Sequence, residues 1–261
     1  MGDFYLRITL AVLVILVLPL GTLFWWSARK DRQKTREQVD ALAALVAPMG
    51  GRIAGREAGA PPSAQLVPPF EHIAYGLLNR LARVRRPRWD LAVDFQRGSW
   101  RVRVSEASMV KENATNRRTH HEHRIEVFTA QLPPTKICRR LHTDFLGRPL
   151  APDTPLTQGA AAGRAPVTVA QRQGQWLRAR LPAPADHEFA VFGADLSAAA
   201  RMLNPQALEH LVTHAATLPH LLTFEGGLLY ATEPSRIDPG TLMPTVDVLL
   251  GLLDRIPYAR P

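Results

Sequence analysis

The pattern of hydrophobic and polar positions separates an apolar N-terminal run from a longer region of short alternating segments. The run Ile8–Trp26 contains no charged residue. It is interrupted only by Thr9, Pro19, Gly21 and Thr22. At a helical rise of about 1.5 Å per residue, roughly twenty residues match a hydrocarbon core of about 30 Å. The run therefore predicts a transmembrane anchor, assigned to residues 1–28.

The end of this run carries residues that membrane interfaces favour. Trp25 and Trp26 close it, and basic residues follow: Arg29, Lys30, Arg32, Lys34 and Arg36. Positively charged flanks stay on the cytoplasmic side. We therefore expect a single-pass cell-membrane protein with its N-terminus outside and its main domain cytoplasmic. A cleaved signal peptide would need a shorter run that ends in small residues, so we expect the anchor to be retained.

Residues 29–69 are predicted to join the anchor to the main domain. Apolar residues at three- and four-residue steps predict a helix from about Ser27 to Ala47, which Pro48 and Gly50-Gly51 end. From Gly55 to Pro69 the chain is rich in Gly, Ala and Pro, which is typical of a linker or surface loop.

Residues 70–261 form the predicted soluble domain. Helical spacing covers Phe70–Val84, and strict alternation in Trp89–Phe95 and Trp100–Val104 predicts a β-hairpin with one buried face. Trp89, Leu91, Val93 and Phe95 should share that face, with Asp90 and Asp94 opposite. The remaining strands are expected at His123–Leu132, Lys136–Phe145, Pro166–Leu181 (as a hairpin) and Glu188–Phe192. A flexible insertion is expected at 147–166.

The last part of the chain reads as helices and a tight hairpin. Asp195, Asn204 and Asp238 are each followed by helical patterns and are the expected N-caps. Gly226-Gly227 should form the turn between two short strands. In the last helix, Pro244 predicts a kink or a later start. Strands followed by helices indicate an α+β fold with an antiparallel sheet and packed helices.

The C-terminal half also resembles a known arrangement. The residues that carry the likeness are Phe189–Phe192, Ala199–Leu203, Pro205–Leu211, Gly226–Tyr230 and Asp238–Pro257. Together they resemble a domain of unknown function in uncharacterised single-span, membrane-anchored bacterial proteins of high-GC genomes. The likeness spans about Ala41 to Pro257. It implies the α+β architecture and the anchor, and it carries over no catalytic residue.

The net charge of the chain limits the classes of partner that we expect. The net charge is +9 and the sequence pI is about 10.5, which favours anionic lipid or nucleic acid. Because the chain is already tethered to a bilayer, membrane lipid is the expected partner and nucleic acid is not. An anionic-lipid patch is predicted where basic residues exceed what helix capping needs. Its members are Arg80, Arg83, Arg85, Arg86 and Arg88.

Histidines are the candidate metal ligands. His120, His121 and His123 flank Glu122, but on a strand His121 and His123 share one face and His120 points to the other. His210 and His214 lie one helical turn apart. A polar hairpin tip and a solvent-exposed helix face are the preferred interpretations, so no metal or cofactor is expected. Cys138 stands alone, which rules out an internal disulfide; its basic neighbours could make it reactive.

No phosphate-binding loop, dinucleotide fingerprint or nucleophile elbow occurs in the sequence. Asp90 and Asp94 could act as a catalytic carboxylate pair only if they were sunk in a cleft. We therefore predict no catalytic residues and a non-enzymatic binding or scaffold domain at the inner membrane surface, with lipid and a protein as partners. The alternative is a membrane-tethered hydrolase or metal-dependent enzyme that uses the histidines.

Overall fold

The chain divides into two compact units, Met1–Leu45 and Val46–Pro261. The computed structural model describes residues 22, 25–26, 29–30, 33–55, 60–70, 83–84, 86–113, 116–140, 165–171 and 174–261. The second unit begins earlier than the predicted domain 70–261, because residues of the predicted linker join its sheet and cover one of its faces.

The described part of the first unit is helical, and residues 33–46 continue to the boundary between the units. A 3-10 turn, Ala47–Met49, follows, and Gly50 with a φ of 65° ends it. The prediction of a helix that ends at Pro48 and Gly50-Gly51 is confirmed.

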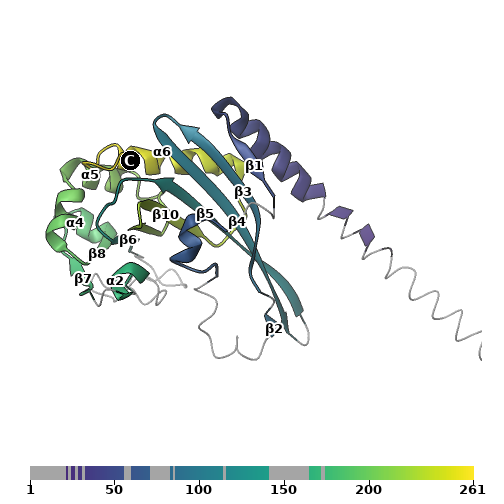
Figure 1. Cartoon of the computed structure of the whole chain (residues 1–261), viewed down its shortest axis with the longest axis horizontal. Helices are drawn as coiled ribbons and strands as arrows, with labels where there is room; N and C mark the ends of the chain where they lie inside the picture. Colours follow the sequence, from purple (N-terminus) through teal and green to yellow (C-terminus); the bar gives the residue numbers. More distant parts are fainter. Residues whose placement is uncertain are drawn as a thin grey trace, which may run out of the picture. The chain divides into compact units, whose positions relative to one another are not determined.

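The second unit contains all the labelled strands and helices (Figure 1). Its strands are β1 (Arg52–Ala54), β2 (Arg83–Val84), β3 (Arg88–Arg97), β4 (Trp100–Asn113), β5 (Asn116–Phe128), β6 (Thr135–Arg139), β7 (Leu177–Ala179), β8 (Phe189–Gly193), β9 (Leu221–Glu225) and β10 (Leu228–Glu233). Its helices are η1 (Ala47–Met49), η3 (Pro62–Gln65), α2 (Val167–Gln171), α3 (Ala185–Glu188), α4 (Leu196–Met202), α5 (Pro205–Thr213) and α6 (Pro239–Leu253).

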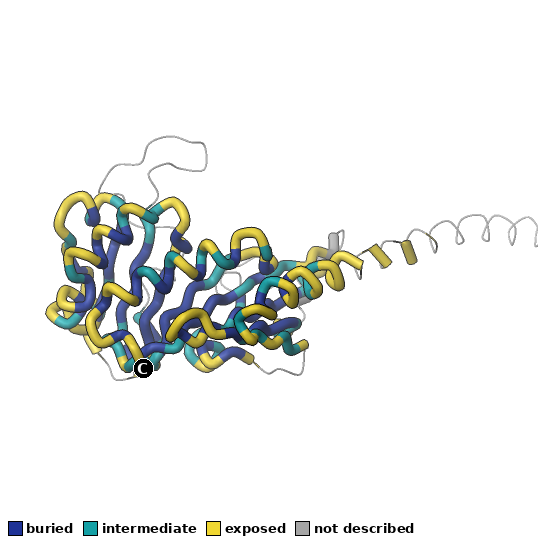
Figure 2. The backbone as a smooth tube through the Cα atoms, turned by 90° about the horizontal axis from the view of Figure 1, so that it is seen from above, coloured by how far each residue is buried: buried dark blue, intermediate teal, exposed yellow. Residues whose placement is uncertain are grey.

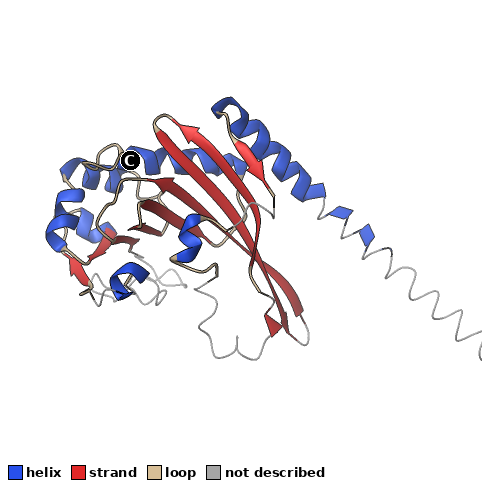
Figure 3. Cartoon of the chain, in the orientation of Figure 1, coloured by secondary structure: helices blue, strands red, loops and turns tan. Residues whose placement is uncertain are grey.

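Within the described residues these strands form one ten-stranded sheet in the order β1-β3-β4-β5-β10-β9-β6-β8-β7, with β2 beside β4. All pairings among the described strands are antiparallel. The predicted α+β class with an antiparallel sheet is therefore confirmed. Figure 3 shows the strands as a continuous layer, with η3 and α2 separate from the long helix α6.

One face of the sheet is apolar and packs against helices. Along β4 and β5, Val102, Val104, Ile125 and Val127 are each at most 1% exposed and point to this face. The buried side of α6 covers it: Leu242, Val246, Leu249, Leu250, Leu252 and Leu253. Figure 2 shows this interior as buried backbone beneath exposed helical turns. This apolar layer is the core of the unit.

The local signals at the C-terminal end predict its elements well. The carboxylates of Asp195 and Asp238 and the side-chain oxygen of Asn204 accept hydrogen bonds from the first turns of α4, α6 and α5. Gly226 and Gly227 have φ angles of 63° and 75°, which a tight hairpin turn requires. All three caps and the turn are confirmed.

Some expected elements are wrong. Val167–Gln171 forms helix α2, and β7 pairs with β8, so no hairpin spans Pro166–Leu181. Of the two alternatives for Pro244, the later start is wrong, because α6 starts at Pro239, directly after the expected cap Asp238, and runs through Pro244. Gly55–Pro69 is more than a surface loop where it is described, because Ser63 is fully buried.

The β3–β4 hairpin is confirmed, but a bulge changes the side chains that it presents. The register shifts between Trp89 and Leu91, so Asp90 is the extra residue and Trp89 turns to the face opposite Leu91. The expectation that Trp89 shares a face with Leu91 is therefore wrong. Strands β4 and β5 extend as a paired ribbon as far as Asn113 and Asn116.

Several predictions lie mainly outside the described residues. They are the transmembrane run Ile8–Trp26, most of the helix Phe70–Val84 and most of the insertion 147–166. Within the described part of the chain, no helix has the length and apolar character needed to span a bilayer. The anchor therefore stays a prediction.

Leu253→Asp tests the docking of α6. Leu253 is 1% exposed, so the substitution places an unpaired charge in the apolar layer. We expect the free energy of unfolding to fall by about 3 kcal/mol or more. Leu177→Asp is the control: Leu177 is 44% exposed, and its change should cost under about 1 kcal/mol. Equal melting temperatures for the two variants would mean that α6 does not bury Leu253.

Candidate functional site

The second face of the sheet is polar even though much of it is buried. One row of directly paired residues crosses it from β3 to β6 and is polar at every position. The row is Asp94, Arg103, Glu126, Tyr230, Thr223 and Lys136. Buried polar side chains cost free energy unless they are paired, so their partners identify what this face is built to hold.

Arg124 lies at the centre of this face and is 1% exposed. Its Nη1 donates to the Ser63 hydroxyl and to the Val67 carbonyl, both at 2.9 Å. Its Nη2 donates to Glu122 Oε1 at 3.3 Å. The guanidinium also lies over two rings, 5.5 Å from the centre of Trp89 and 5.9 Å from that of Tyr230. Such stacking is strongest when the cation is shielded from water.

Two glutamates on the same strand hold main-chain amides. Glu126 Oε1 accepts from the Ser63 N–H, and Glu122 Oε2 accepts from the Phe70 N–H, each at 2.8 Å. Glu122, Arg124 and Glu126 alternate along β5, so all three point to the polar face. We call these three residues the charged clamp and residues 60–70 the covering segment. The clamp binds that segment through backbone atoms and one hydroxyl.

The covering segment ends in a strained, buried aromatic residue. Phe70 is 2% exposed and has a φ of 59°, a conformation that is rare for a bulky residue. Its ring belongs to a small apolar cluster with Ala107 and Met109, against which Trp89 packs. Because such a backbone costs of order 1–3 kcal/mol, the surroundings must enforce it. The hydrogen bond to Glu122 and the aromatic cluster supply that constraint.

The clamp has an unusual electrostatic balance. Burial raises the pKa of Glu126. Its hydrogen bonds to Ser63 and the charges of Arg124 and Arg103 lower this pKa but do not cancel the effect of burial. Glu126 Oε2 has no hydrogen-bond partner among the described residues. Burial and Glu225 likewise raise the pKa of Tyr230, whose hydroxyl donates to Glu225 Oε2 at 3.1 Å. In both groups burial disfavours the charged form.

A similar contact occurs further along the same face. Glu225 is 1% exposed and accepts from the Thr168 N–H at 2.7 Å and from its hydroxyl at 2.6 Å. These bonds attach the start of α2 to β9. The polar face thus holds a second chain segment through a main-chain amide and a neighbouring hydroxyl.

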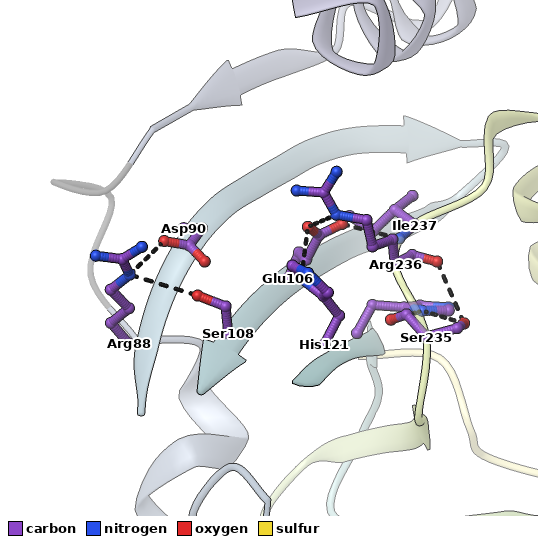
Figure 4. Close-up of polar contacts among 9 residues, drawn as sticks. Arg88, Asp90, Glu106, Ser108, His121, Ser235, Arg236 and Ile237 are labelled. Atoms are coloured by element: carbon purple, nitrogen blue, oxygen red, sulfur yellow. Dashed lines mark hydrogen bonds and ion pairs between the residues drawn. The ribbon is translucent and has the colours of Figure 1, made fainter. Parts of the chain in front are cut away.

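The histidine cluster on β5 is divided by the sheet. His120 lies in register on the polar face, and His121 and His123 on the opposite one, as predicted. The interpretation of the histidines as a polar hairpin tip is wrong, because strand β5 runs through all three of them. Figure 4 shows His121 beside Glu106, with Nδ1 and Oε1 3.7 Å apart, and Arg236 Nε 3.3 Å from the same carboxylate. His123 Nδ1 donates to the Ser235 carbonyl at 3.0 Å.

This arrangement does not favour a cation. Burial and the charge of Arg236 lower the pKa of His121, and Glu106 Oε2 is already occupied by the Ile237 N–H at 2.9 Å. Within the described residues, no group of three or more His, Cys, Asp or Glu side chains is placed to bind a metal.

His210 and His214 stack with ring centres 4.2 Å apart. The expectation that they face solvent is wrong for His210, which is 7% exposed and packs on α6 at Gly251. His210 Nε2 donates to the Val248 carbonyl at 2.9 Å, and His214 Nδ1 donates to the His210 carbonyl at 3.0 Å. Burial lowers the pKa of His210. One ring nitrogen of each of these two histidines is therefore engaged in a hydrogen bond to a main-chain carbonyl.

Other candidates are also separated or inert. The bulge puts Asp90 beside Arg88, at 3.0 Å, while Asp94 lies 3.7 Å from Arg103 on the polar face. They do not form a carboxylate pair. Cys138 lies buried in strand β6, and burial raises its pKa to about 12, which agrees with the interpretation as a strand cysteine and not with a reactive thiolate.

Of the predicted lipid patch, Arg83 lies in β2, and Arg86 and Arg88 are exposed. Arg80 and Arg85 lie outside the described residues. In the first unit, Trp25 and Trp26 are 63% and 59% exposed. Arg29 and Lys30 each lie 5.2 Å from the ring centre of the tryptophan one turn earlier, and Arg32 is outside the described residues.

The sequence analysis missed the clamp. Its signal is three charges of alternating sign on one side of a strand, at Glu122, Arg124 and Glu126. Period two assigns such charges to solvent unless another segment covers them. That segment, residues 60–70, precedes the clamp residues by more than fifty positions and reads as a loop. Only the tertiary structure brings the two together.

Comparisons with known proteins give little more. No family model matches the chain, and no curated protein matches it. Among solved structures, it is similar to the mycobacterial trehalose monomycolate transport factor A, with a TM-score of 0.42 and 12% identity. The alignment covers 85% of this chain and 97% of the other. Similarity at this level supports no argument about function.

Arg124→Met tests whether the clamp depends on its guanidinium. The substitution leaves two buried glutamates uncompensated, so we expect a loss of about 3–5 kcal/mol in the free energy of unfolding by urea. Arg101→Met is the matched control, because Arg101 is exposed and stacks on Phe128 alone. It should cost less than about 1 kcal/mol. Adding Gln at both glutamates should restore part of the lost stability, and equal losses for Arg124 and Arg101 would contradict the clamp.

Glu126→Gln tests the raised pKa. The folded state binds the Glu126 proton more tightly than the unfolded chain, so stability falls as the pH rises from about 4.3 through the folded pKa. Gln stays neutral and keeps an acceptor for the Ser63 N–H. The variant should therefore lose less stability than the wild-type chain over this interval, measured by urea unfolding. The exposed Glu209→Gln is the control. Parallel curves for wild type and Glu126→Gln would rule out the assignment.

Proposed function

We propose that this chain is a single-pass membrane protein whose α+β unit is a non-enzymatic binding or scaffold domain at the inner membrane surface. One observation carries the membrane part of the proposal. Trp25 and Trp26 remain 63% and 59% exposed on a helix, and each has a cation one turn further on. Exposed tryptophans beside basic residues, at the end of an apolar run, are typical of a bilayer interface.

The clamp supports the binding part of the proposal. Its carboxylates and guanidinium contact main-chain N–H and C=O groups of another segment, which is how proteins recognise peptide backbone. The described histidines supply no convergent set for the alternative hydrolase or metal-dependent enzyme. His123, His210 and His214 each donate to a main-chain carbonyl. The resemblance to single-span bacterial proteins agrees with this proposal.

The orientation follows from the charge of the flank. Arg29, Lys30 and the basic residues after them stay in the cytoplasm under the positive-inside rule, and the second unit stays with them. The anionic inner leaflet is then the nearest partner of this basic chain.

Reporter fusions after Pro261 test anchoring and orientation. We expect activity in the membrane fraction from a fluorescent protein that matures only in the cytoplasm. We expect none from a phosphatase that is active only after export. A control chain with Arg29, Lys30, Arg32, Lys34 and Arg36 replaced by Gln should lose this bias. Phosphatase activity from the unmodified chain, or a reporter that leaves the membrane in mild salt, would refute the proposal.

A further inference from the structure

The β4–β5 hairpin extends beyond the rest of the sheet. Strand β3 pairs with β4 only as far as Ser108, and β10 pairs with β5 only from His123 onward. The two strands nevertheless continue as a ribbon from Met109↔His120 to Asn113↔Asn116. Among the described strands, β2 alone pairs with this part of the ribbon, at Lys111 and Glu112. We call β2, Met109–Asn113 and Asn116–His120 the arm, which Figures 1 and 3 show reaching away from α4 and α5.

The outer part of the arm is basic. Lys111 pairs directly with Arg118, and Val84 completes that row. In the next row Glu112 lies between Arg83 and Arg117. The arm therefore carries one acid against four bases, and the exposed Arg86 follows it closely.

Two of these bases, Lys111 and Arg118, lie directly opposite each other, and like charges in that position are destabilising. Arg118 and Thr119 are exposed at this end of the ribbon. A basic, exposed ribbon that reaches away from the core is well suited to a partner of opposite charge.

The observations favour a lipid surface over other polyanions. Single-stranded nucleic acid needs exposed aromatic rings for its bases. On the neighbouring strands, Trp89 is stacked against Arg124 and Trp100 is 2% exposed. An anionic leaflet needs only a basic surface, and a tethered domain meets it at high effective concentration.

We propose that the arm is a second membrane contact that binds anionic lipid headgroups. The inference rests on the proposed function, because the predicted anchor brings the arm to the bilayer. It adds Lys111, Arg117 and Arg118 to the predicted patch, because they lie in the two rows that β2, with Arg83 of that patch, joins.

A label on the arm of the full chain tests this. Thr119 is exposed, so Thr119→Cys can carry a fluorophore, while Cys138 is 2% exposed and its pKa of about 12 keeps it unreactive. The chain is placed in nanodiscs of phosphatidylcholine, alone or with phosphatidylserine, that carry a headgroup nitroxide. We expect strong quenching only with phosphatidylserine. It should be lost near 1 M salt, where the Debye length falls from about 8 Å to about 3 Å.

Two double variants, one on the arm and one elsewhere on the second unit, compare the effect of removing the same number of positive charges. Lys111→Gln with Arg118→Gln should weaken the lipid-bound state of the arm about 25-fold, at about fivefold per basic residue. Arg180→Gln with Arg201→Gln removes the same charge from exposed positions near β7 and on α4, and it should leave the quenching unchanged. The salt series on the otherwise unmodified chain remains decisive if a charge variant does not fold.

Several outcomes would overturn the inference. Equal quenching in neutral and anionic nanodiscs removes the role of charge, and equal loss in the two charge variants removes the role of the arm. A change in the fluorescence of the label that depends on protein concentration points to strand pairing between copies. A change that an oligonucleotide causes, whatever the lipid, points to nucleic acid. A chain that leaves the nanodisc altogether refutes the proposed anchor as well. A retained chain with an unquenched arm refutes this inference alone.

Discussion

The hydrogen bonds and ring contacts of Arg124 are the interaction on which the arrangement of the polar face depends. This one side chain compensates buried carboxylates, fixes the covering segment and fills the space between two aromatic rings. A charge taken out of water is costly, and its partners repay the cost only when every donor is used in good geometry. Ser63, Val67 and Thr232 supply the remaining acceptors. The covering segment and β5 therefore form a single structural unit.

The two faces of the sheet are therefore covered through different kinds of interaction. On the apolar face, leucines and valines of α6, β4 and β5 exclude water without needing exact directions. On the polar face, directional bonds to backbone atoms decide which segment lies where. A buried ionic cluster adds little stability over an apolar one, but it accepts fewer alternative partners. The first face supplies most of the folding free energy, and the second selects which chain segments cover the sheet.

The limits of sequence-based prediction follow the same division. Asp195, Asn204, Asp238 and the Gly226-Gly227 turn were predicted correctly because caps and turns are decided by neighbours in the chain. The bulge at Asp90 was not predicted, because one extra residue leaves the alternation of apolar and polar side chains intact on either side of it. Helix α2 was read as strand because Val167 and Val169 have the two-residue spacing of a strand, whereas the partner that holds this segment, Glu225, is distant in sequence. The clamp was missed because partners far apart in sequence bury its charges.

The ionic character of the clamp also sets how the domain opens locally. When the covering segment lifts, three charged side chains regain water, and their hydration offsets much of the free energy of the broken contacts. The apolar surface that this opening exposes is confined to the small cluster of Phe70, Ala107, Met109 and Trp89. Such an opening depends only weakly on denaturant, whereas global unfolding depends on it steeply. The amides of Ser63 and Phe70 should therefore exchange with solvent through small fluctuations long before those of the α6-covered strands.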